Sequence, residues 1–531
     1  MAYEDVKDKV LGIVSELSDE MNYQALINKS SELIEYLNKN PSDKDYAYLI
    51  INVCANDVDD VRLKLFFYSI LLQMPICLAK DNFALEQSVD ILLKTPDISV
   101  EEKYVYFYEI SYRLFVTPVL QTDDNKLLLW KLYNSIVKKY HDAIWSKEKF
   151  PYISIDKRNN DFYIVITDQI LGEEHGPTKS ALDRCRALIA NNNNVLLINT
   201  GEMCFYDISV LFYGFVFANH VDELDNMESI NYKGVSIPFC QIGKGIMDIP
   251  KLRDYLHIIY DYAPNMVIDI GGNTLLGNLC NYFIPTLAVT LGPDNLVRTT
   301  EKWQTLGRKI TDKDRTMLQR IGYPEDKVIE MIMTFECKEQ SIVLSKADLG
   351  MKEEDFEIAI VGGRLDDEVG PEFLEMIRKV AGSVSNVRFN FCGIFSKYEK
   401  LIGEDPVCSG ICRFLGMQSD MMAVLDNIDL YVNPIRLGGG TSAQEAMLKG
   451  VPVVTCKTGD VYANCHDDFA VDDYDEMVQV IERYVNDADY YKSQSKKAHE
   501  LGELEHDTIG EFNRIIEECH KRDDDNYFLN I

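Results

Sequence analysis

Apolar residues recur every three to four positions through roughly the first 150 residues, which is the spacing of one buried face of an α-helix. Short polar joints such as NKNPSDK separate the helical segments, and Gly12 is the only glycine before Gly172. The expected helices are Tyr3–Leu17, Tyr23–Leu37, Asp45–Ala55, Asp60–Leu72, Phe83–Leu93, Glu101–Phe115 and Lys126–Tyr140. No repeat of fixed period joins them. The pattern predicts an all-helical domain over residues 1–150, which either binds a partner protein or buttresses the next domain.

From Asp161 onward, short apolar runs alternate with helical segments, as in parallel sheets with helices on both faces. The first series of runs is Phe162–Thr167, Val195–Asn199, Val235–Phe239, Met266–Ile270 and Thr286–Thr290. The second series is Phe356–Val361, Val387–Cys392, Arg413–Gly416, Asp429–Asn433 and Pro452–Thr455. The two series predict an α/β fold with two doubly wound domains, residues 151–340 and 341–486.

A charged stretch, about Asp294 to Met351, connects the two series and is expected to be mostly helical. Helical spacing returns after Asp472, and residues 487–531 are expected to form helices, with Asp487–Lys521 running back across the first sheet domain. Sheet domains in tandem place a cleft between the carboxyl ends of their strands, where ligands bind in this class of fold.

The sequence from Asp429 to Thr455 is the strongest candidate for ligand binding. It consists of strand Leu430–Val432, the glycines Gly438, Gly439 and Gly440, a helix, and strand Val451–Thr455. Two residue pairs fit a capping box at the start of the helix: Thr441 with Gln444, or Ser442 with Glu445. The glycines let the backbone approach a ligand, and the free N–H groups of a helix start favour an anion such as a diphosphate. By themselves, the three glycines fit a tight turn without a ligand equally well.

Composition narrows the possible partners. The charge of 54 − 86 = −32 disfavours nucleic acid and anionic membrane surfaces. The start, MAYEDVKDKV, does not resemble a signal peptide, and no uninterrupted apolar stretch approaches the length of a membrane span. Thirteen scattered cysteines indicate reduced thiols and a cytoplasmic protein. Nothing in the sequence calls for a metal or a bound cofactor.

A histidine follows the first strand of the first sheet domain. His175 precedes Gly176-Pro177-Thr178 at a predicted helix start. A histidine at a strand end facing a cleft suits general base work near neutral pH, and a purely structural role fits the residue equally well. Lys179, one turn into that helix, is compatible with a solvated charge.

Two more glycine turns follow strands at the expected cleft. Gly271, Gly272 and Asn273 either contact an acceptor or a donor phosphate, or form an ordinary turn in which Asn273 or Thr274 caps the next helix. Arg364 follows a second Gly-Gly turn, where its fork of donors would suit a diphosphate. The acidic residues nearby and at the end of the chain are interpreted as helix-start acids (Asp366, Asp367, Glu368) and as a solvated tail (Asp523–Asp525).

Three stretches together resemble the GT-B glycosyltransferases, which combine two Rossmann-like domains with parallel sheets and use a nucleotide-sugar donor. They are IVGGRLDDEV, FLGMQSDMMAVLDNIDLYVNPIR and GGGTSAQEAMLKGVPVV, within a resemblance covering roughly residues 160–520. The resemblance to family 4-like members implies donor phosphates at Arg364, Gly439, Gly440, Thr441 and Ser442, the base at Met417 and Gln418, and the ribose at Glu445. Arg436 is expected to help Arg364 hold the diphosphate.

The chain also departs from the family 4 pattern. Leu437 stands where the first of two glutamates is expected, and Val369 where a lysine is expected. The form NP-x-x-x-GGGTS is similar to O-GlcNAc transferase-type enzymes and to bacterial cytoplasmic protein N-glycosyltransferases. Those enzymes also carry a helical domain before the GT-B pair and use a histidine in the first sheet domain. The similarity therefore implies a protein or glycoprotein acceptor.

These features predict a metal-independent hexosyl- or N-acetylhexosaminyltransferase with a nucleotide-sugar co-substrate, UDP-linked as in its relatives, and no other cofactor. His175 is the candidate group for deprotonating or orienting the acceptor. Two alternatives remain. One is a non-catalytic GT-B subunit that binds a transferase or substrate protein, and the other is a nucleotide-sugar epimerase.

Overall fold

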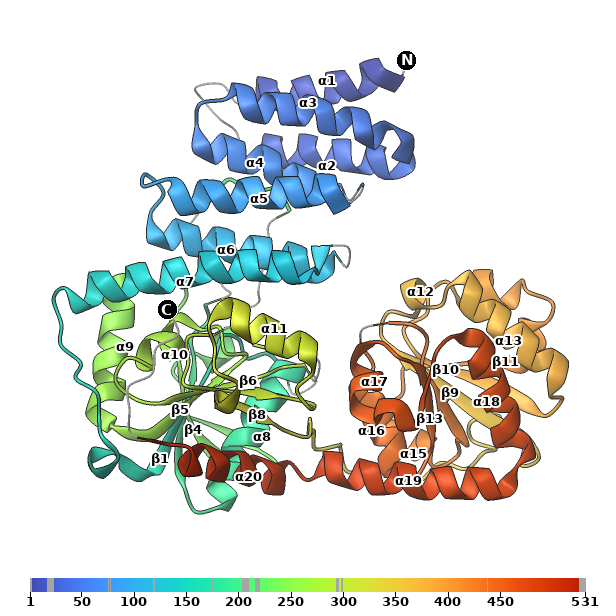
Figure 1. Ribbon diagram of the computed structural model, residues 1–531. Helices are drawn as coiled ribbons and strands as arrows, with labels where there is room; N and C mark the ends of the chain where they lie inside the picture. Colours follow the sequence, from blue (N-terminus) through green and yellow to red (C-terminus); the bar gives the residue numbers. More distant parts are fainter. Residues whose placement is uncertain are drawn as a thin grey trace.

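The structure is a computed structural model that describes residues 2–16, 23–74, 76, 78–117, 120–172, 175–202, 210–214, 220–292, 296–297, 299–436 and 438–524. A stack of helices stands on the first of two α/β domains, and the second α/β domain lies beside the first (Figure 1). Within the described residues, no helix is long and apolar enough to cross a membrane.

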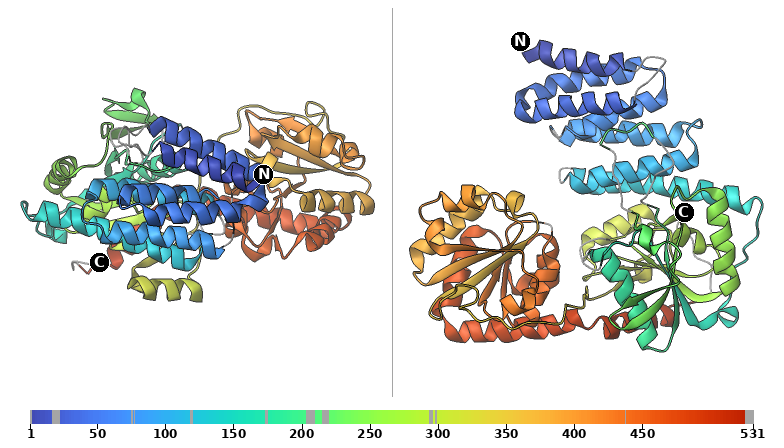
Figure 2. Two further views of the ribbon diagram at one scale, coloured as in Figure 1. Left: turned by 90° about the horizontal axis from the view of Figure 1, so that it is seen from above. Right: turned by 180° about the vertical axis from the view of Figure 1, so that it is seen from behind.

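The helical region contains the seven helices that the hydrophobic spacing predicts. They are α1 (Ala2–Ser15), α2 (Tyr23–Lys39), α3 (Lys44–Asp57), α4 (Val61–Leu72), α5 (Leu78–Lys94), α6 (Val100–Val116) and α7 (Asp123–Trp145). Neighbouring helices pack side by side in a layered array, as the views from above and behind show (Figure 2). Their apolar core continues without a break into the first sheet domain, because side chains such as Tyr140 and Ile144 of α7 share one cluster with Leu276 and Ile259.

The first α/β domain contains an eight-stranded sheet in the order β3-β4-β2-β1-β5-β6-β7-β8. The described strand pairs are parallel except for β3 with β4. The strands are β1 (Asn159–Thr167), β2 (Asn194–Asn199), β3 (Ser229–Tyr232), β4 (Val235–Gln241), β5 (Pro264–Ile270), β6 (Thr286–Val289), β7 (Trp303–Leu306) and β8 (Val328–Glu330), and the helices are α8 (Gly176–Ala190), α9 (Ile249–Tyr262), α10 (Leu275–Cys280) and α11 (Asp312–Ile321). One face packs on α8, and the other packs on α9, α10 and the helical array.

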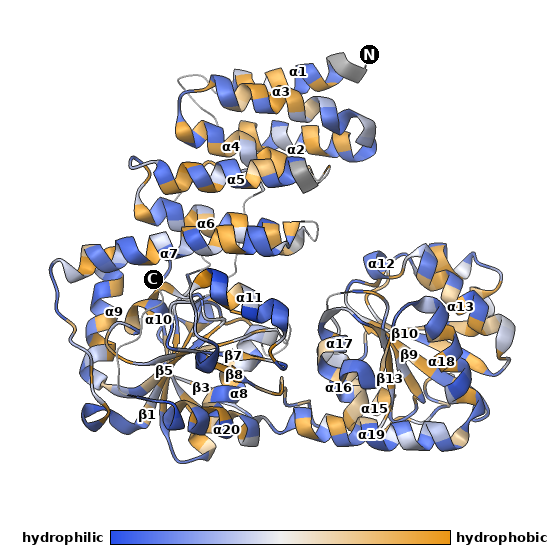
Figure 3. Ribbon diagram, in the orientation of Figure 1, coloured by the Kyte–Doolittle hydropathy of each residue, from blue (hydrophilic) through white to orange (hydrophobic). Residues whose placement is uncertain are grey.

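The second α/β domain contains a six-stranded sheet in the order β11-β10-β9-β12-β13-β14, whose described strand pairs are parallel. Its strands are β9 (Phe356–Gly362), β10 (Val387–Gly393), β11 (Cys412–Gly416), β12 (Leu430–Val432), β13 (Val453–Cys456) and β14 (Ala470–Val471), and its helices are α12 (Leu365–Glu368), α13 (Pro371–Ser383), α14 (Cys408–Ile411), α15 (Met421–Leu425), α16 (Gly440–Leu448), α17 (Gly459–Cys465) and α18 (Tyr474–Asn486). In both domains the central strands, such as β5 and β9, are mostly hydrophobic, and most of the surrounding helices alternate apolar and polar positions (Figure 3).

The last two helices connect the domains. Helix α19 (Ala488–His506) packs along α16 of the second domain, and α20 (Thr508–Lys521) packs on α8 of the first (Figure 1). The prediction of a solvated tail is wrong for Asp523, whose buried carboxylate pairs with Arg158 at 2.6 Å and Lys302 at 2.8 Å. Asp525 lies outside the described residues. The C-terminal segment is therefore pinned to the first domain by buried charges.

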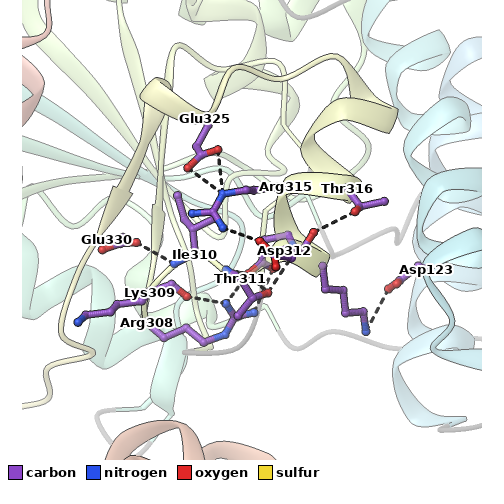
Figure 4. A network of polar contacts seen from close by, with 12 residues as sticks. Asp123, Arg308, Lys309, Ile310, Thr311, Asp312, Arg315, Thr316, Glu325 and Glu330 are labelled. Atoms are coloured by element: carbon purple, nitrogen blue, oxygen red, sulfur yellow. Dashed lines mark hydrogen bonds and ion pairs between the residues drawn. The ribbon is translucent and has the colours of Figure 1, made fainter.

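The connection between the sheets is not mostly helical, contrary to the expectation for Asp294–Met351. It contains β7, β8 and one α-helix, α11, followed by an extended stretch after β8. Helix α11 begins with a capping box between Thr311 and Asp314, and Arg308 pairs with Asp314 at 2.6 Å. Lys313 reaches Asp123 of α7 at 3.5 Å, so this network also joins the first sheet domain to the helical array (Figure 4).

Candidate active site between the two sheet domains

A cleft of about 800 Å³ lies between the two sheet domains, a volume typical of small-molecule sites. The first domain contributes Gly176 and Lys179 from the start of α8, and Leu291 after β6. The second domain contributes the segments that follow β9, β10, β11 and β12, together with the start of α16. The cleft therefore lies at the carboxyl ends of the strands, as expected for this class of fold.

The structure gathers in this cleft every residue that the resemblance assigns to a donor. Those lining it are Arg364, Met417, Gln418, Arg436, Gly439, Gly440, Thr441, Ser442 and Glu445. They come from three separate segments, which follow β9, β11 and β12, and the fold brings them together. His175, Gly271, Gly272 and Asn273 are not among the lining residues, although Gly176 and Lys179 beside His175 are.

Helix α16 begins without a side-chain cap, so the predicted capping boxes are wrong. The helix starts at Gly440, and Gly439 is its N-cap in a left-handed conformation with φ of 101°. Thr441 and Ser442 therefore lie inside the first turn, and the Ser442 hydroxyl instead contacts Tyr431 Oη at 2.8 Å and Gly439 O at 3.1 Å. Because the N-cap residue Gly439 has no side chain to accept from the first amides, the N-terminus of α16 can offer these donors to an anion in the cleft.

Arg436 holds the glycine-rich turn in place through buried hydrogen bonds. Its side chain is only 4% exposed, and four of its five N–H groups are engaged. The acceptors are Asn433 Oδ1 at 2.7 Å, Glu368 Oε2 at 2.7 Å, Val361 O at 2.7 Å and Tyr431 Oη at 3.1 Å. Arg436 therefore shapes the turn and has little capacity left for direct contact with a phosphate.

The glycines of the turn make room for arginine side chains. A Cβ on Gly439 would lie 2.5 Å from Arg436 Nη2, and one on Gly438 would lie 3.2 Å from Arg364 Nη2. At the end of β9, a Cβ on Gly362 would lie 2.5 Å from Arg436 Nη1. The glycine pattern is thus required by the packing of the guanidinium groups as well as by any ligand that approaches the backbone.

Arg364 is the exposed guanidinium of the site. Its side chain is 68% exposed, and Nε donates to Glu368 Oε1 at 3.3 Å. Glu368, predicted only as a helix-start acid of α12, bridges Arg364 and Arg436 through its two oxygens. This bridge leaves the Arg364 guanidinium facing a cleft in which it can bind a diphosphate.

The remaining donor-side residues surround the same space. Met417 is 71% exposed, and the Gln418 side-chain amide donates to the Leu415 carbonyl. Glu445, one turn into α16, is half-buried and engaged in the protein's interaction network. An exposed thioether in a cleft offers an apolar surface to a ring, and a carboxylate accepts hydrogen bonds from hydroxyl groups.

His175 occupies the N-cap position of α8, but its side chain makes no capping hydrogen bond to the helix. Its Nδ1 lies 3.0 Å from Thr178 Oγ1, which also accepts from the Leu171 amide at 2.9 Å. Burial lowers the pKa of His175, which keeps the imidazole neutral at physiological pH. If Nδ1–H donates to Thr178, then Nε2 is the basic nitrogen.

The turn after β5 plays a packing role in this structure. Gly271 and Gly272 have φ of 97° and 68°, and a Cβ on Gly272 would lie 2.6 Å from Ala288 Cβ. Thr274 caps α10 by accepting from the Gly277 amide at 3.0 Å. Of the two alternatives for this segment, the geometry favours the ordinary capped turn.

A possible metal-binding group of side chains lies away from the cleft. In the described part of the chain, the side chains close enough together to hold a metal ion are His220, Asp222 and Asp225. His220 there pairs with Asp225 at 2.9 Å, and Asp225 accepts from Gln241 at 2.8 Å, so both belong to a local polar network.

The second α/β domain, which contains the glycine-rich turn, matches a known protein family. Residues 338–487 match the family model described as glycosyl transferases group 1. No curated protein matches the sequence. A mutant of the O-GlcNAc transferase of Thermobaculum terrenum is similar in structure, at 12% identity and a TM-score of 0.48, covering 98% of this chain and 97% of the other. A glycosyltransferase from Rickettsia africae has 12% identity and a TM-score of 0.48, covering 69% and 100%.

The fold is of the GT-B class, and its second α/β domain is similar to glycosyl transferases group 1. The family match over residues 338–487 and the two parallel sheets with a cleft between them support this class. The resemblance drawn from the motifs is confirmed at this level, and the family match supports glycosyl transfer as the reaction class.

Sequence reasoning missed the residues that hold the motif residues in place. Neither Glu368 nor Tyr431 belongs to a recognisable motif by itself. Both bind Arg436, which lies on a different loop from Glu368 and five positions after Tyr431. Lys179 follows a candidate residue but was interpreted as a surface charge, whereas it lines the cleft.

Proposed function

We propose that this protein transfers a hexosyl or N-acetylhexosaminyl group from a UDP-linked donor to an acceptor, and that the acceptor is a polypeptide side chain. The observation that carries the proposal is the uncapped start of α16, which shares one cleft with the exposed guanidinium of Arg364. Both features favour a diphosphate at the same place.

The donor is proposed to lie across the second domain. The diphosphate accepts from the first amides of α16 and from Arg364, the base lies against Met417 and Gln418, and the ribose hydroxyls donate to Glu445. The sugar then extends toward the first domain, where Gly176 at the start of α8 forms the opposite wall.

The reaction breaks the bond between the anomeric carbon and the diphosphate oxygen and forms a bond from that carbon to the acceptor. The leaving diphosphate gains negative charge, which Arg364 and the α16 amides stabilise in place of a metal ion. His175 takes the acceptor proton at Nε2 when Nδ1–H donates to Thr178. Closure of the domains would exclude water and protect the donor from hydrolysis.

The polypeptide acceptor is supported by the helical array. Leu49 and Val53 are 60% and 56% exposed and lie one turn apart on α3, and contiguous exposed apolar surface often marks a protein-binding site. The array also shares its core with the first sheet domain, which is proposed to hold the acceptor.

The test is a transfer and hydrolysis assay of the isolated chain with labelled UDP-glucose, UDP-galactose and UDP-N-acetylglucosamine, with and without cell-protein acceptors. We expect label on protein from one donor, and loss of most of that rate in His175→Ala but not in His141→Ala, a histidine of α7 that stacks on Tyr282. Interconversion of free donors would favour the epimerase. Tight binding without turnover would favour the non-catalytic subunit.

A further inference from the structure

The charge of the proposed ligand exceeds what the second domain presents to it. A nucleotide diphosphate carries at least two negative charges, and Arg364 is the exposed guanidinium on that side. Arg436 is buried and has four of its five N–H groups engaged by protein acceptors. A second cation for the diphosphate must therefore come from elsewhere in the cleft.

Lys179 lies on the opposite wall of the same cleft. It projects from the first turn of α8 in the first sheet domain and is half-buried. Among the described residues, no hydrogen bond or ion pair engages its ammonium group. Lys338 also lines the cleft, but it already takes part in an interaction within the protein. Lys179 is therefore the lysine of the cleft whose charge lacks a described protein partner.

A buried thiol places Lys179 close to the donor side. The pKa of Cys337 is raised to about 12, chiefly by burial and then by the charge of Glu445, while the charge of Lys179 acts in the opposite direction. Both charged side chains therefore lie near the same sulfur, which is on the connection between the two domains. Lys179 also lines the same cleft as Glu445 and the start of α16.

Lys179 does not stabilise helix α8. A cation in the first turn of a helix lies at the positive end of the helix dipole, where anions are favoured. This unfavourable interaction disappears when an anion binds in front of the helix.

We propose that Lys179 binds the donor's diphosphate from the first domain, opposite Arg364, so that donor binding itself draws the two sheet domains together. This inference rests on the proposed function. The diphosphate then serves as the counter-ion shared by the two walls, and the catalytic arrangement is completed only when the donor is present.

The first experiment measures UDP and UMP binding by calorimetry, with GDP as a second probe, on the full chain. We expect Lys179→Gln to weaken UDP binding by about 10- to 100-fold, the range for one charge-assisted hydrogen bond, and to weaken UMP binding much less. Lys179→Arg should restore most of the affinity. Lys309→Gln removes an equal charge from the same domain outside the cleft and should change neither Kd.

The second experiment measures the radius of gyration by small-angle X-ray scattering with and without saturating UDP. The wild type should contract on binding, and Lys179→Gln at a UDP concentration that saturates it should contract less. Equal UDP affinity or equal contraction in wild type and Lys179→Gln would overturn the inference alone. Failure of the wild type to bind UDP or GDP would overturn the proposed function, and the inference with it.

Discussion

Arg436 and Glu368 form a buried ion pair beneath the glycine-rich turn, with Nη1 and Oε2 2.7 Å apart. The other oxygen of Glu368 accepts from Arg364 Nε at 3.3 Å. One carboxylate therefore orders two arginines with different tasks. The buried guanidinium holds the turn, and the exposed one is left at the mouth of the cleft.

Replacing Glu368 by Gln should weaken both tasks. The buried guanidinium of Arg436 would lose its counter-charge, and we expect the free energy of unfolding to fall by about 2–3 kcal/mol. Urea unfolding followed by circular dichroism measures this change. Asp367→Asn is the matched control, because Asp367 is 84% exposed and pairs only loosely with Lys397 at 3.5 Å. A loss no larger than that of the control would contradict the bridging role.

Replacing Gly439 by Ala should disrupt the turn rather than the sheet. The residue has φ of 101°, and the added Cβ would lie 2.5 Å from Arg436 Nη2. Left-handed backbone alone costs a non-glycine residue about 1–2 kcal/mol, and displacement of Arg436 adds to it. We expect lower stability together with loss of UDP binding, measured by thermal shift and calorimetry. Gly382→Ala on α13 is the control, because the added Cβ would enter open space and the φ of Gly382 is not positive. If UDP binding were unchanged in both Gly382→Ala and Gly439→Ala, this account would be refuted.

Much of the fold could be predicted because its strands are continuous apolar runs and its helices keep a regular spacing. Strands β7 and β8 were missed because they are short and lie in a charged segment, and β7 buries the polar Gln304 and Thr305. Asp523 was misjudged because its partner Arg158 is 365 positions away. Local charge density gives no information about pairing over such a distance.

The candidate site was predictable where a residue type by itself implies a geometry. A glycine turn before a helix and an arginine after a strand are local signals, and the structure brings them into one cleft. The choice of helix start was wrong because Gly439, in a left-handed conformation, takes the cap position that a hydroxyl residue was expected to hold. Glu368 could not be assigned because its role depends on contacts between separate loops. Leu437 lies outside the described residues.

The contact between the helical array and the first sheet domain should make stability depend on pH. The buried carboxyl of Glu202 accepts from Tyr104 of α6 and from the Leu275 amide at 2.8 Å. Burial raises the pKa of Glu202 from 4.5 to about 7. The folded state therefore binds the proton more tightly than the unfolded state, so the stabilisation is complete below about pH 4.5 and is lost as the pH rises to about 7.

A shift of this size corresponds to about 3 kcal/mol between the two ends of that range. We expect the unfolding temperature to fall between pH 5 and pH 7.5, and Glu202→Gln to flatten the fall, because Gln stays neutral and still accepts from both donors. Differential scanning calorimetry across the range measures this. Glu223→Gln, at an exposed position, should leave the slope unchanged. An equal slope in wild type and Glu202→Gln would show that other groups set the pH dependence.

The central claim is that the cleft binds a nucleotide sugar through Arg364, and calorimetry tests it most directly. Wild type and Arg364→Ala are titrated with UDP, GDP, UDP-glucose, UDP-N-acetylglucosamine and GDP-mannose, with Lys379→Ala as an exposed control on α13. We predict that one nucleotide sugar binds wild type and Lys379→Ala equally, and binds Arg364→Ala at least about 10-fold more weakly. The folded stability of Arg364→Ala should be unchanged, because the side chain is 68% exposed. Equal affinity of wild type and Arg364→Ala, or no binding by any of the three proteins, would contradict the account.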